Sequence, residues 1–217
     1  MFPSFIEMPF TYIICILVMV TSIIGFYFKP FYQFFIYHPY IVFKGKRIHT
    51  IFTSAFVHKN WWHLFFNLYV FYSVMRDVEC IILEISHAII IIKLICLLLV
   101  SSGILLPNLI LGWFCRNKIQ KSFVGFSGAG FCSMGFSILF LPLDHPKEHY
   151  KYIPLYFSYE FAISLFIVCG LLATIFIKSS NNHKGHLIRL VAGFILAIAI
   201  RPGLILEIVN HIKFRIN

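Results

Sequence analysis

Long apolar runs separated by short polar or proline-containing connectors extend along the whole chain. A helix of about 20 apolar residues crosses a bilayer, so the pattern predicts six transmembrane helices. We expect them at about residues 9–28, 51–75, 88–106, 123–141, 153–177 and 185–200. No small-residue cleavage signal follows the first run, which is therefore expected to remain as a span. The aromatic, proline-interrupted stretch 29–50 is typical of an interfacial loop.

Composition supports a membrane protein and argues against a soluble one. Of the 217 residues, 60% are hydrophobic and 12% charged, against roughly 25% charged in a soluble domain. We therefore predict one all-α transmembrane domain over residues 1–217. The net charge of +10 comes from basic residues scattered through the connectors, which suits a membrane surface better than nucleic acid. The 6 cysteines form no CxxC pair, so we expect neither a disulfide framework nor a metal or other cofactor.

Polar side chains within the second predicted span form the first candidate set. His63 and Asn67 are four residues apart and share one helical face, and His58 precedes them. Such residues often satisfy each other between packed helices. Alternatively, they are hydrogen-bond donors directed at a developing negative charge, as an oxyanion hole requires.

A serine among small residues opens the fourth predicted span. Ser127 lies between Gly125 and Gly128. Small residues are what a close helix–helix contact needs. A serine at a helix N-terminus, with glycines that let another backbone approach, is equally suited to be an exposed nucleophile.

A histidine, His186, opens the last predicted span. Taken alone it is an ordinary interfacial polar residue, and with His183 it makes a poor metal motif. Taken together, the three sets supply what peptide hydrolysis needs: a nucleophile in Ser127, a base in His186 and oxyanion donors in His63 and Asn67. No acidic residue lies near His186 in sequence, so a Ser-His dyad is expected.

With these motifs in this order, the chain resembles the rhomboid intramembrane serine proteases over about residues 53–199. The matching features are the HxxxxHxxxN pattern ending at Asn67, the GxSG pattern around Ser127 and the histidine of the last span. The resemblance implies a six-helix rhomboid-like bundle, a catalytic dyad and an oxyanion hole that includes the Ser127 backbone N–H. It also implies structural roles for His58, Gly125, Gly128, Gly193 and Phe131, which is expected to pack against His186. Glu79 matches an acidic residue that follows the second span in the family.

Two features depart from the family pattern. Arg189 stands where the family usually has a small glycine, one turn after the catalytic histidine. Its side chain either turns outward toward the membrane surface or crowds the dyad, and crowding would favour an inactive member. The Trp-Arg pair usual before the second span is replaced by His49 and Thr50; Arg47 takes over this loop anchor or the anchor is lost.

The expected activity is endopeptidase cleavage of transmembrane helices in membrane-protein substrates within the lipid bilayer. The alternatives are an inactive rhomboid-like protein that binds membrane clients and a channel or transporter. Segments WHLFFN and VGFSG are similar to the endoplasmic-reticulum branch, which favours a secretory-pathway membrane. Basic residues near the span ends place the Ser127 end in the cytosol, whereas the resemblance implies an active site that opens away from it.

Overall fold

The described part of the chain is built of helices and loops. The computed structural model describes residues 5–86, 89–140, 163–164, 166–168 and 180–216. Apart from an isolated bridge between Tyr37 and Phe123, these residues contain no β-structure. The predicted all-α class is confirmed for them. The elements are α1 (Pro9–Tyr27), α2 (Lys29–Phe35), α3 (Pro39–Val42), α4 (Thr50–Thr53), η1 (Ser54–Phe56), α5 (Trp61–Ser86), α6 (Ile89–Cys115), α7 (Ser127–Phe140), α9 (Ser180–Ile200) and α10 (Leu204–Ile216).

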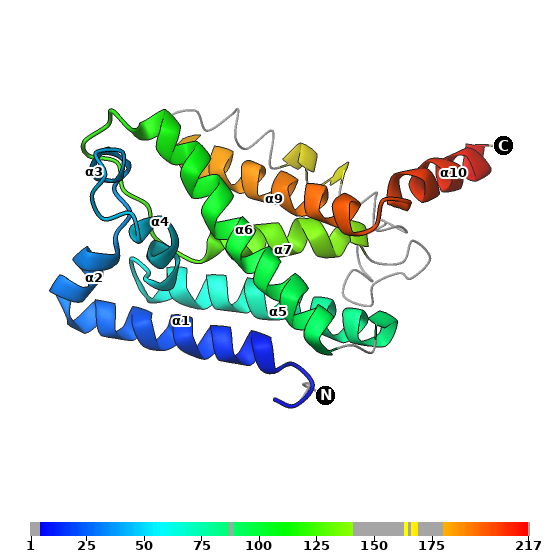
Figure 1. The fold of residues 1–217 in the computed structure, drawn as a ribbon, viewed down its shortest axis with the longest axis horizontal. Helices are drawn as coiled ribbons and strands as arrows, with labels where there is room; N and C mark the ends of the chain where they lie inside the picture. The colour runs from blue at the N-terminus through cyan, green and yellow to red at the C-terminus, as the bar shows by residue number, and fades with distance from the viewer. Residues whose placement is uncertain (1–4, 87–88, 141–162, 165, 169–179, 217) are drawn as a thin grey trace.

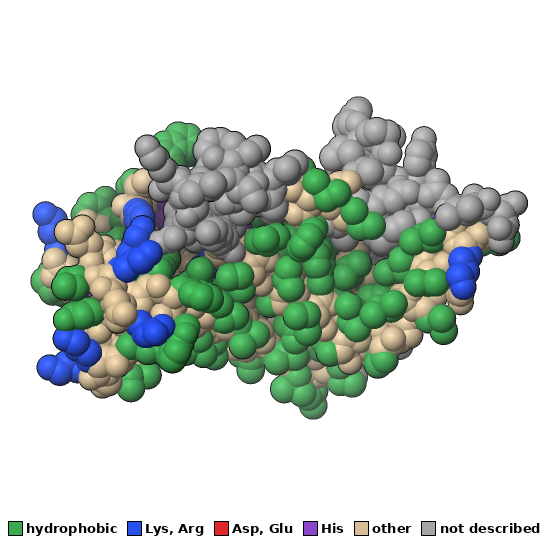
Figure 2. All heavy atoms as spheres, turned by 90° about the horizontal axis from the view of Figure 1, so that it is seen from above, with side chains coloured by type: hydrophobic (Ala, Val, Ile, Leu, Met, Phe, Trp, Pro, Cys, Tyr) green, Lys and Arg blue, Asp and Glu red, His purple; other side chains and the backbone are tan. Residues whose placement is uncertain are grey.

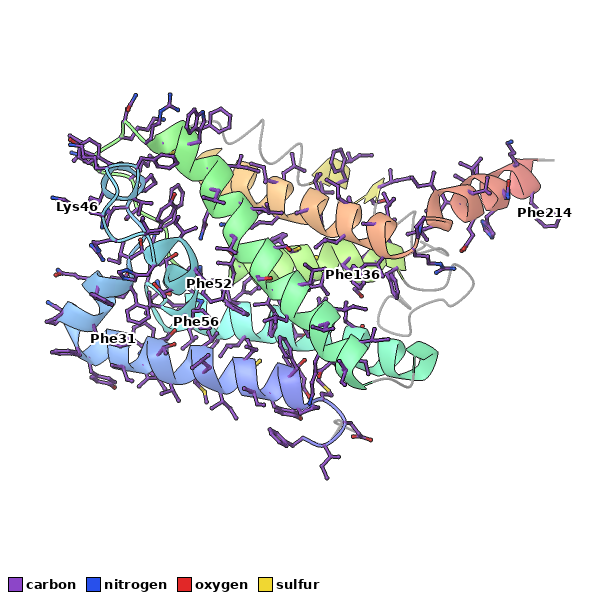
Figure 3. All side chains as sticks on the ribbon, viewed as in Figure 1. Phe31, Lys46, Phe52, Phe56, Phe136 and Phe214 are labelled. Atoms are coloured by element: carbon purple, nitrogen blue, oxygen red, sulfur yellow. The ribbon has the colours of Figure 1, made fainter. Side chains whose placement is uncertain are left out.

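Helix α7 occupies the middle of the bundle. Helices α1, α5, α7 and α9 lie side by side in this order, and α6 crosses α5 and α7 obliquely (Figure 1). The buried core joins Phe71 of α5, Leu99 of α6 and Phe136 of α7, and Phe56 of η1 packs on the same cluster (Figure 3). Helix α7 begins at Ser127 and contacts α5, α6 and α9, so these three helices fix the position of this serine.

Glycines bring the backbones around α7 into close contact. A Cβ atom at Gly128 would lie 2.4 Å from the carbonyl oxygen of Gly103 on α6. A Cβ atom at Gly193 on α9 would lie 2.0 Å from the carbonyl oxygen of Cys132 on α7. Backbone atoms cannot move aside as a flexible side chain can, so both positions require glycine. The small residues of the fourth predicted span therefore serve helix packing, whatever else they do.

The outer surface is suited to a lipid environment. Within the described residues, α1 and residues Ile90–Cys115 of α6 are long and apolar enough to cross a membrane. The pair α9 and α10 gives a third candidate if its two helices count as one broken span. Figure 2 shows a mainly hydrophobic face along the middle of the molecule, with Lys and Arg side chains toward its two ends. Apolar flanks between charged ends are expected where helices pass through a bilayer.

The predicted count of six spans is not reached within the described residues, which give two or three candidates. Helix α5 is long enough to cross a membrane but contains His63, Asn67 and several charged residues, so it is not apolar enough to count as a candidate span. Helix α7 is apolar but, with 14 residues, too short. The predicted fifth span, 153–177, lies almost entirely outside the described residues.

Several predicted boundaries were wrong. The second span was expected to end at residue 75, but α5 continues to Ser86. The second span was expected to start at residue 51, but α5 begins at Trp61, after Asn60 Oδ1 accepts a hydrogen bond from the His63 backbone N–H (2.8 Å) and caps the helix. The third was expected to end before Pro107, yet α6 continues to Cys115. Helix α9 starts at Ser180, before the predicted start at residue 185.

Helix α10 was not predicted. It follows α9 after a short break, at an angle of 95°, and extends away from the bundle (Figure 1). Phe214 near its end is 84% exposed (Figure 3). The turn is held by Arg201, which donates to the Phe140 carbonyl (3.2 Å) and pairs with Glu207.

Two further contacts hold the N-terminal segments in place. The buried carboxylate of Glu79 on α5 accepts hydrogen bonds from the backbone N–H groups of Phe10 and Thr11 and from the Thr11 hydroxyl. The carboxylate therefore satisfies backbone N–H groups that have no partner within the helix at the start of α1.

In the loop 29–50, Arg47 donates to the Phe34 carbonyl (2.7 Å) and to the Gln33 carbonyl. Arg47 thus anchors this loop in the place of the missing Trp-Arg pair.

Candidate active site

Hydrogen bonds from three directions fix the segment that leads into Ser127. The Phe123 N–H donates to the Tyr37 carbonyl (2.9 Å), and the Gly125 N–H donates to the Ser54 carbonyl (3.0 Å). The Phe126 N–H donates to His58 Nε2 (3.1 Å). Ser127 then follows as the first residue of α7. A serine at a fixed chain reversal before a helix is exposed on one side and has backbone N–H donors beside it.

His58 connects this segment to α1. Its ring is fully buried; Nε2 accepts from Phe126, so Nδ1 carries the proton and donates to the Ser22 hydroxyl (2.8 Å). This assigns a neutral histidine with both ring nitrogens paired. The position fits a structural role, as the family resemblance implies.

Replacing His58 with alanine is expected to lower the free energy of unfolding by about 3 kcal/mol, because the Phe126 N–H and the Ser22 hydroxyl lose their partner and a cavity forms. Unfolding in mixed micelles measures this loss. His49→Ala is the control: this histidine is exposed, with one hydrogen bond to the Phe34 carbonyl and a stack on Phe34, so its loss should cost much less stability. An equal effect of the two variants would contradict the role given to His58.

Gly125 makes room for the ring of His63. Its φ of +110° is a backbone conformation that L side chains rarely adopt. A Cβ atom there would lie 2.6 Å from His63 Cε1. Ring and glycine backbone are therefore in direct contact, and Nδ1 of His63 is buried with no hydrogen-bond partner. An imidazole with an unpaired nitrogen has hydrogen-bonding capacity left for a ligand.

His186 is held against α7 by an aromatic contact. Its ring stacks on Phe131 with centroids 4.3 Å apart and planes 23° apart. Phe131 lies one turn after Ser127 on the same helix. The stack therefore fixes the imidazole on the side of α7 on which the serine begins the helix.

Ser127, His63 and His186 line one cavity of about 80 Å³ between η1, the start of α5, α6, the segment 122–127 and the start of α9. This is room for several water molecules. Exposed residues Lys59 and Ser122 also line it and mark its open side. The structure thus brings together a serine, two histidines and a glycine from segments far apart in the sequence.

Asn67 is placed differently from the other predicted site residues. It is buried, it does not line the cavity, and its Nδ2 donates to the His63 carbonyl one turn earlier on α5 (2.8 Å). In this arrangement its amide supports the helix that carries His63. An oxyanion role would require its side chain to turn toward the cavity.

Arg189 does not turn outward. Its side chain is 8% exposed and also lines the cavity. Its Nη1 lies 3.4 Å from Ser127 Oγ and 3.4 Å from His186 Nδ1. Of the two alternatives raised by the sequence, the structure shows the inward one: a guanidinium beside both members of the predicted dyad.

Sequence reasoning missed three groups that form the site. Ser22 is the partner of His58, the Ser54 carbonyl holds Gly125, and Lys59 stands at the cavity's open side. Lys59 directly follows His58 and could have been noticed; the other two are joined to the site by tertiary contacts alone. Among the described residues, no group of three or more His, Cys, Asp or Glu could hold a metal ion.

Comparison with known proteins identifies the family of this chain. No curated protein matches the chain. The model of the rhomboid domain matches residues 45–203. This range includes α4 to α9, and with them every residue of the cavity. A chain that matches this family over most of its length, and that has apolar helices long enough to cross a membrane, belongs to the rhomboid family of integral membrane proteins.

Proposed function

We propose that this protein is an intramembrane serine endopeptidase that uses Ser127 and His186. The observation that carries the proposal is the common cavity, which brings Ser127, His63 and His186 together from three different helices. The rhomboid family, generally made up of intramembrane proteases, supports the same reaction. The cavity opens beside exposed polar residues, so water needed for hydrolysis has access.

In this reaction Ser127 Oγ attacks the carbonyl carbon of a peptide bond while His186 takes its proton. The carbonyl oxygen becomes an oxyanion, which the Ser127 backbone N–H and the ring of His63 stabilise. His186 then gives the proton to the leaving amine, and the acyl-enzyme forms. Water hydrolyses the ester bond with His186 again acting as the base, and this step restores Ser127.

The proposed substrates are transmembrane helices of other membrane proteins, met within the lipid bilayer. A helix pairs its peptide carbonyls internally, so a segment must unwind before one carbonyl reaches Ser127. Helix-destabilising residues in a substrate are therefore expected to favour cleavage. Similarity to the endoplasmic-reticulum branch favours a secretory-pathway membrane.

A fluorophosphonate probe tests the proposal on the full chain in detergent or nanodiscs. We expect one covalent adduct, which mass spectrometry assigns to Ser127. Ser127→Ala removes the nucleophile and should remove the adduct, whereas Ser122→Ala, at an exposed serine of the cavity rim, should retain it. Failure of the natural chain to form an adduct, or an adduct that survives Ser127→Ala, would overturn the assignment.

A rhomboid-like protein that binds membrane clients without cleaving them is the second candidate. The position of Arg189 favours it, because a guanidinium beside Ser127 and His186 occupies space that substrate needs. Arg189→Gly in the labelling experiment separates the two candidates. Adduct formation by this variant, but not by the natural chain, would support the client-binding role.

A further inference from the structure

Arg189 carries a positive charge into the site that the proposed peptidase reaction does not use. It lies on α9 three residues after His186, and its guanidinium is directed into the cavity. Its contacts to Ser127 Oγ and His186 Nδ1 are long, at 3.4 Å each, and neither partner is a carboxylate. Its Nε is buried with no hydrogen-bond partner. A guanidinium offers five donors, so most of its capacity remains open.

Among the residues that the structure describes, the charge around Arg189 is unbalanced. Lys59 and His63 line the same cavity, and none of its described lining residues is acidic. Three of the described carboxylates have their partners elsewhere: Glu79 at the start of α1, Asp77 with Arg76, and Glu207 with Arg201. A buried cation without a counter-ion is costly, which favours binding of an anion at this place.

The chemistry of the guanidinium and the size of the cavity favour a carboxylate. A planar guanidinium accepts a carboxylate through two parallel N–H···O bonds. The cavity of about 80 Å³ holds a group of this size. Exposed Lys59 at the open side would attract negative charge toward Arg189.

We propose that Arg189 binds a carboxylate of the polypeptide that enters the cavity, so that the protein selects an acidic side chain or a free carboxyl terminus next to Ser127. The identity of the ligand as a substrate rests on the proposed function; the carboxylate site itself does not. Arg189 is then a specificity-determining residue rather than an obstruction. In this arrangement the ligand fills the place that a counter-ion would take.

Peptide binding to the full-length Ser127→Ala protein in zwitterionic nanodiscs tests the inference. The probes are three fluorescent short apolar peptides of one sequence: one with an internal Asp and an amidated end, one with Asn instead, and the Asn peptide with a free carboxyl terminus. By fluorescence anisotropy we expect at least one carboxylate peptide to bind about 10-fold more tightly than the amidated Asn peptide, as a charge-assisted bond implies. Tighter binding of the Asp peptide identifies the ligand as an acidic side chain. Tighter binding of the Asn peptide with a free carboxyl terminus identifies the ligand as a chain terminus. Equal binding of all three peptides overturns the proposal.

Variants at arginine positions locate the site. Arg189→Gln should abolish the preference and Arg189→Lys should retain part of it, because a point charge remains without the planar fork. Arg201→Gln, at the pair between α9 and α10, should leave the preference unchanged. A preference that survives Arg189→Gln, or stronger binding of a phosphoserine peptide than of the Asp peptide, overturns the assignment.

If Arg189→Gln does not fold, the comparison of the three peptides in the Ser127→Ala protein still decides the question. The Ser127→Ala protein lacks the nucleophile, so peptide binding to it does not depend on the outcome of the labelling experiment. Absence of a fluorophosphonate adduct would therefore overturn the proposed peptidase alone, and absence of a carboxylate preference would overturn the inference alone.

Discussion

Replacing His186 with alanine is expected to slow the reaction of Ser127 with a fluorophosphonate by about 1,000-fold, the middle of the range for loss of a general base. The serine hydroxyl loses its proton as it attacks, and the proposed base is the imidazole of His186, which stacks on Phe131 and lines the cavity. Second-order rate constants for adduct formation, measured with natural and variant protein in the same micelle, give the ratio.

His211→Ala on α10 is the matched control for this rate and should leave it unchanged, since α10 does not line the cavity. Thermal unfolding of both variants separates a lost base from a lost fold. A His186→Ala protein that keeps both its fold and the natural rate would remove His186 from the mechanism.

Replacing Gly193 with alanine is expected to lower the free energy of unfolding by about 3 kcal/mol, at the upper end for overpacking of a core. The added Cβ would lie 2.0 Å from the Cys132 carbonyl oxygen and 2.7 Å from the Phe136 nitrogen. Both atoms belong to the backbone of α7, so α7 and α9 would have to separate. Denaturation in mixed micelles measures the loss.

Gly130→Ala provides a control on α7 itself. A Cβ atom there meets Val70 Cγ1 at 3.7 Å, an ordinary contact, and alanine favours a helix over glycine by about 1 kcal/mol. This variant should therefore be neutral or slightly stabilising. Equal losses from Gly193→Ala and Gly130→Ala would show that the contact between α7 and α9 is looser than described.

Helix positions followed from the sequence where they depend on local hydrophobicity. The first predicted span, 9–28, agrees closely with α1. The end of α6 did not follow, because proline usually ends a helix. Pro107 deprives the Gly103 carbonyl of its helical donor, and this carbonyl lies against Gly128 of α7 in the close crossing of the two helices. Such a tertiary contact leaves no signal in the spacing of α6 itself.

The candidate site was predictable as a set of residues but not as a geometry. Motif spacing indicated Ser127, His63 and His186, which the structure places around one cavity. The rotamers of Asn67 and Arg189 could not be read from spacing, because each depends on what neighbouring helices leave open. Asn67 bonds to its own helix, and Arg189 fills the space that a glycine at its position would have left.

Helix α1 lies outside the residues that match the rhomboid domain, 45–203, yet two groups inside that domain depend on it. The Glu79 carboxylate and His58 Nδ1 both find their partners on α1, at Thr11 and Ser22. A protein restricted to residues 45–203 would leave the Glu79 carboxylate without its donors on Thr11 and His58 Nδ1 without its partner Ser22. Expression designs for this protein should therefore begin before α1, because the limits of sequence similarity are narrower than the limits of the folding unit.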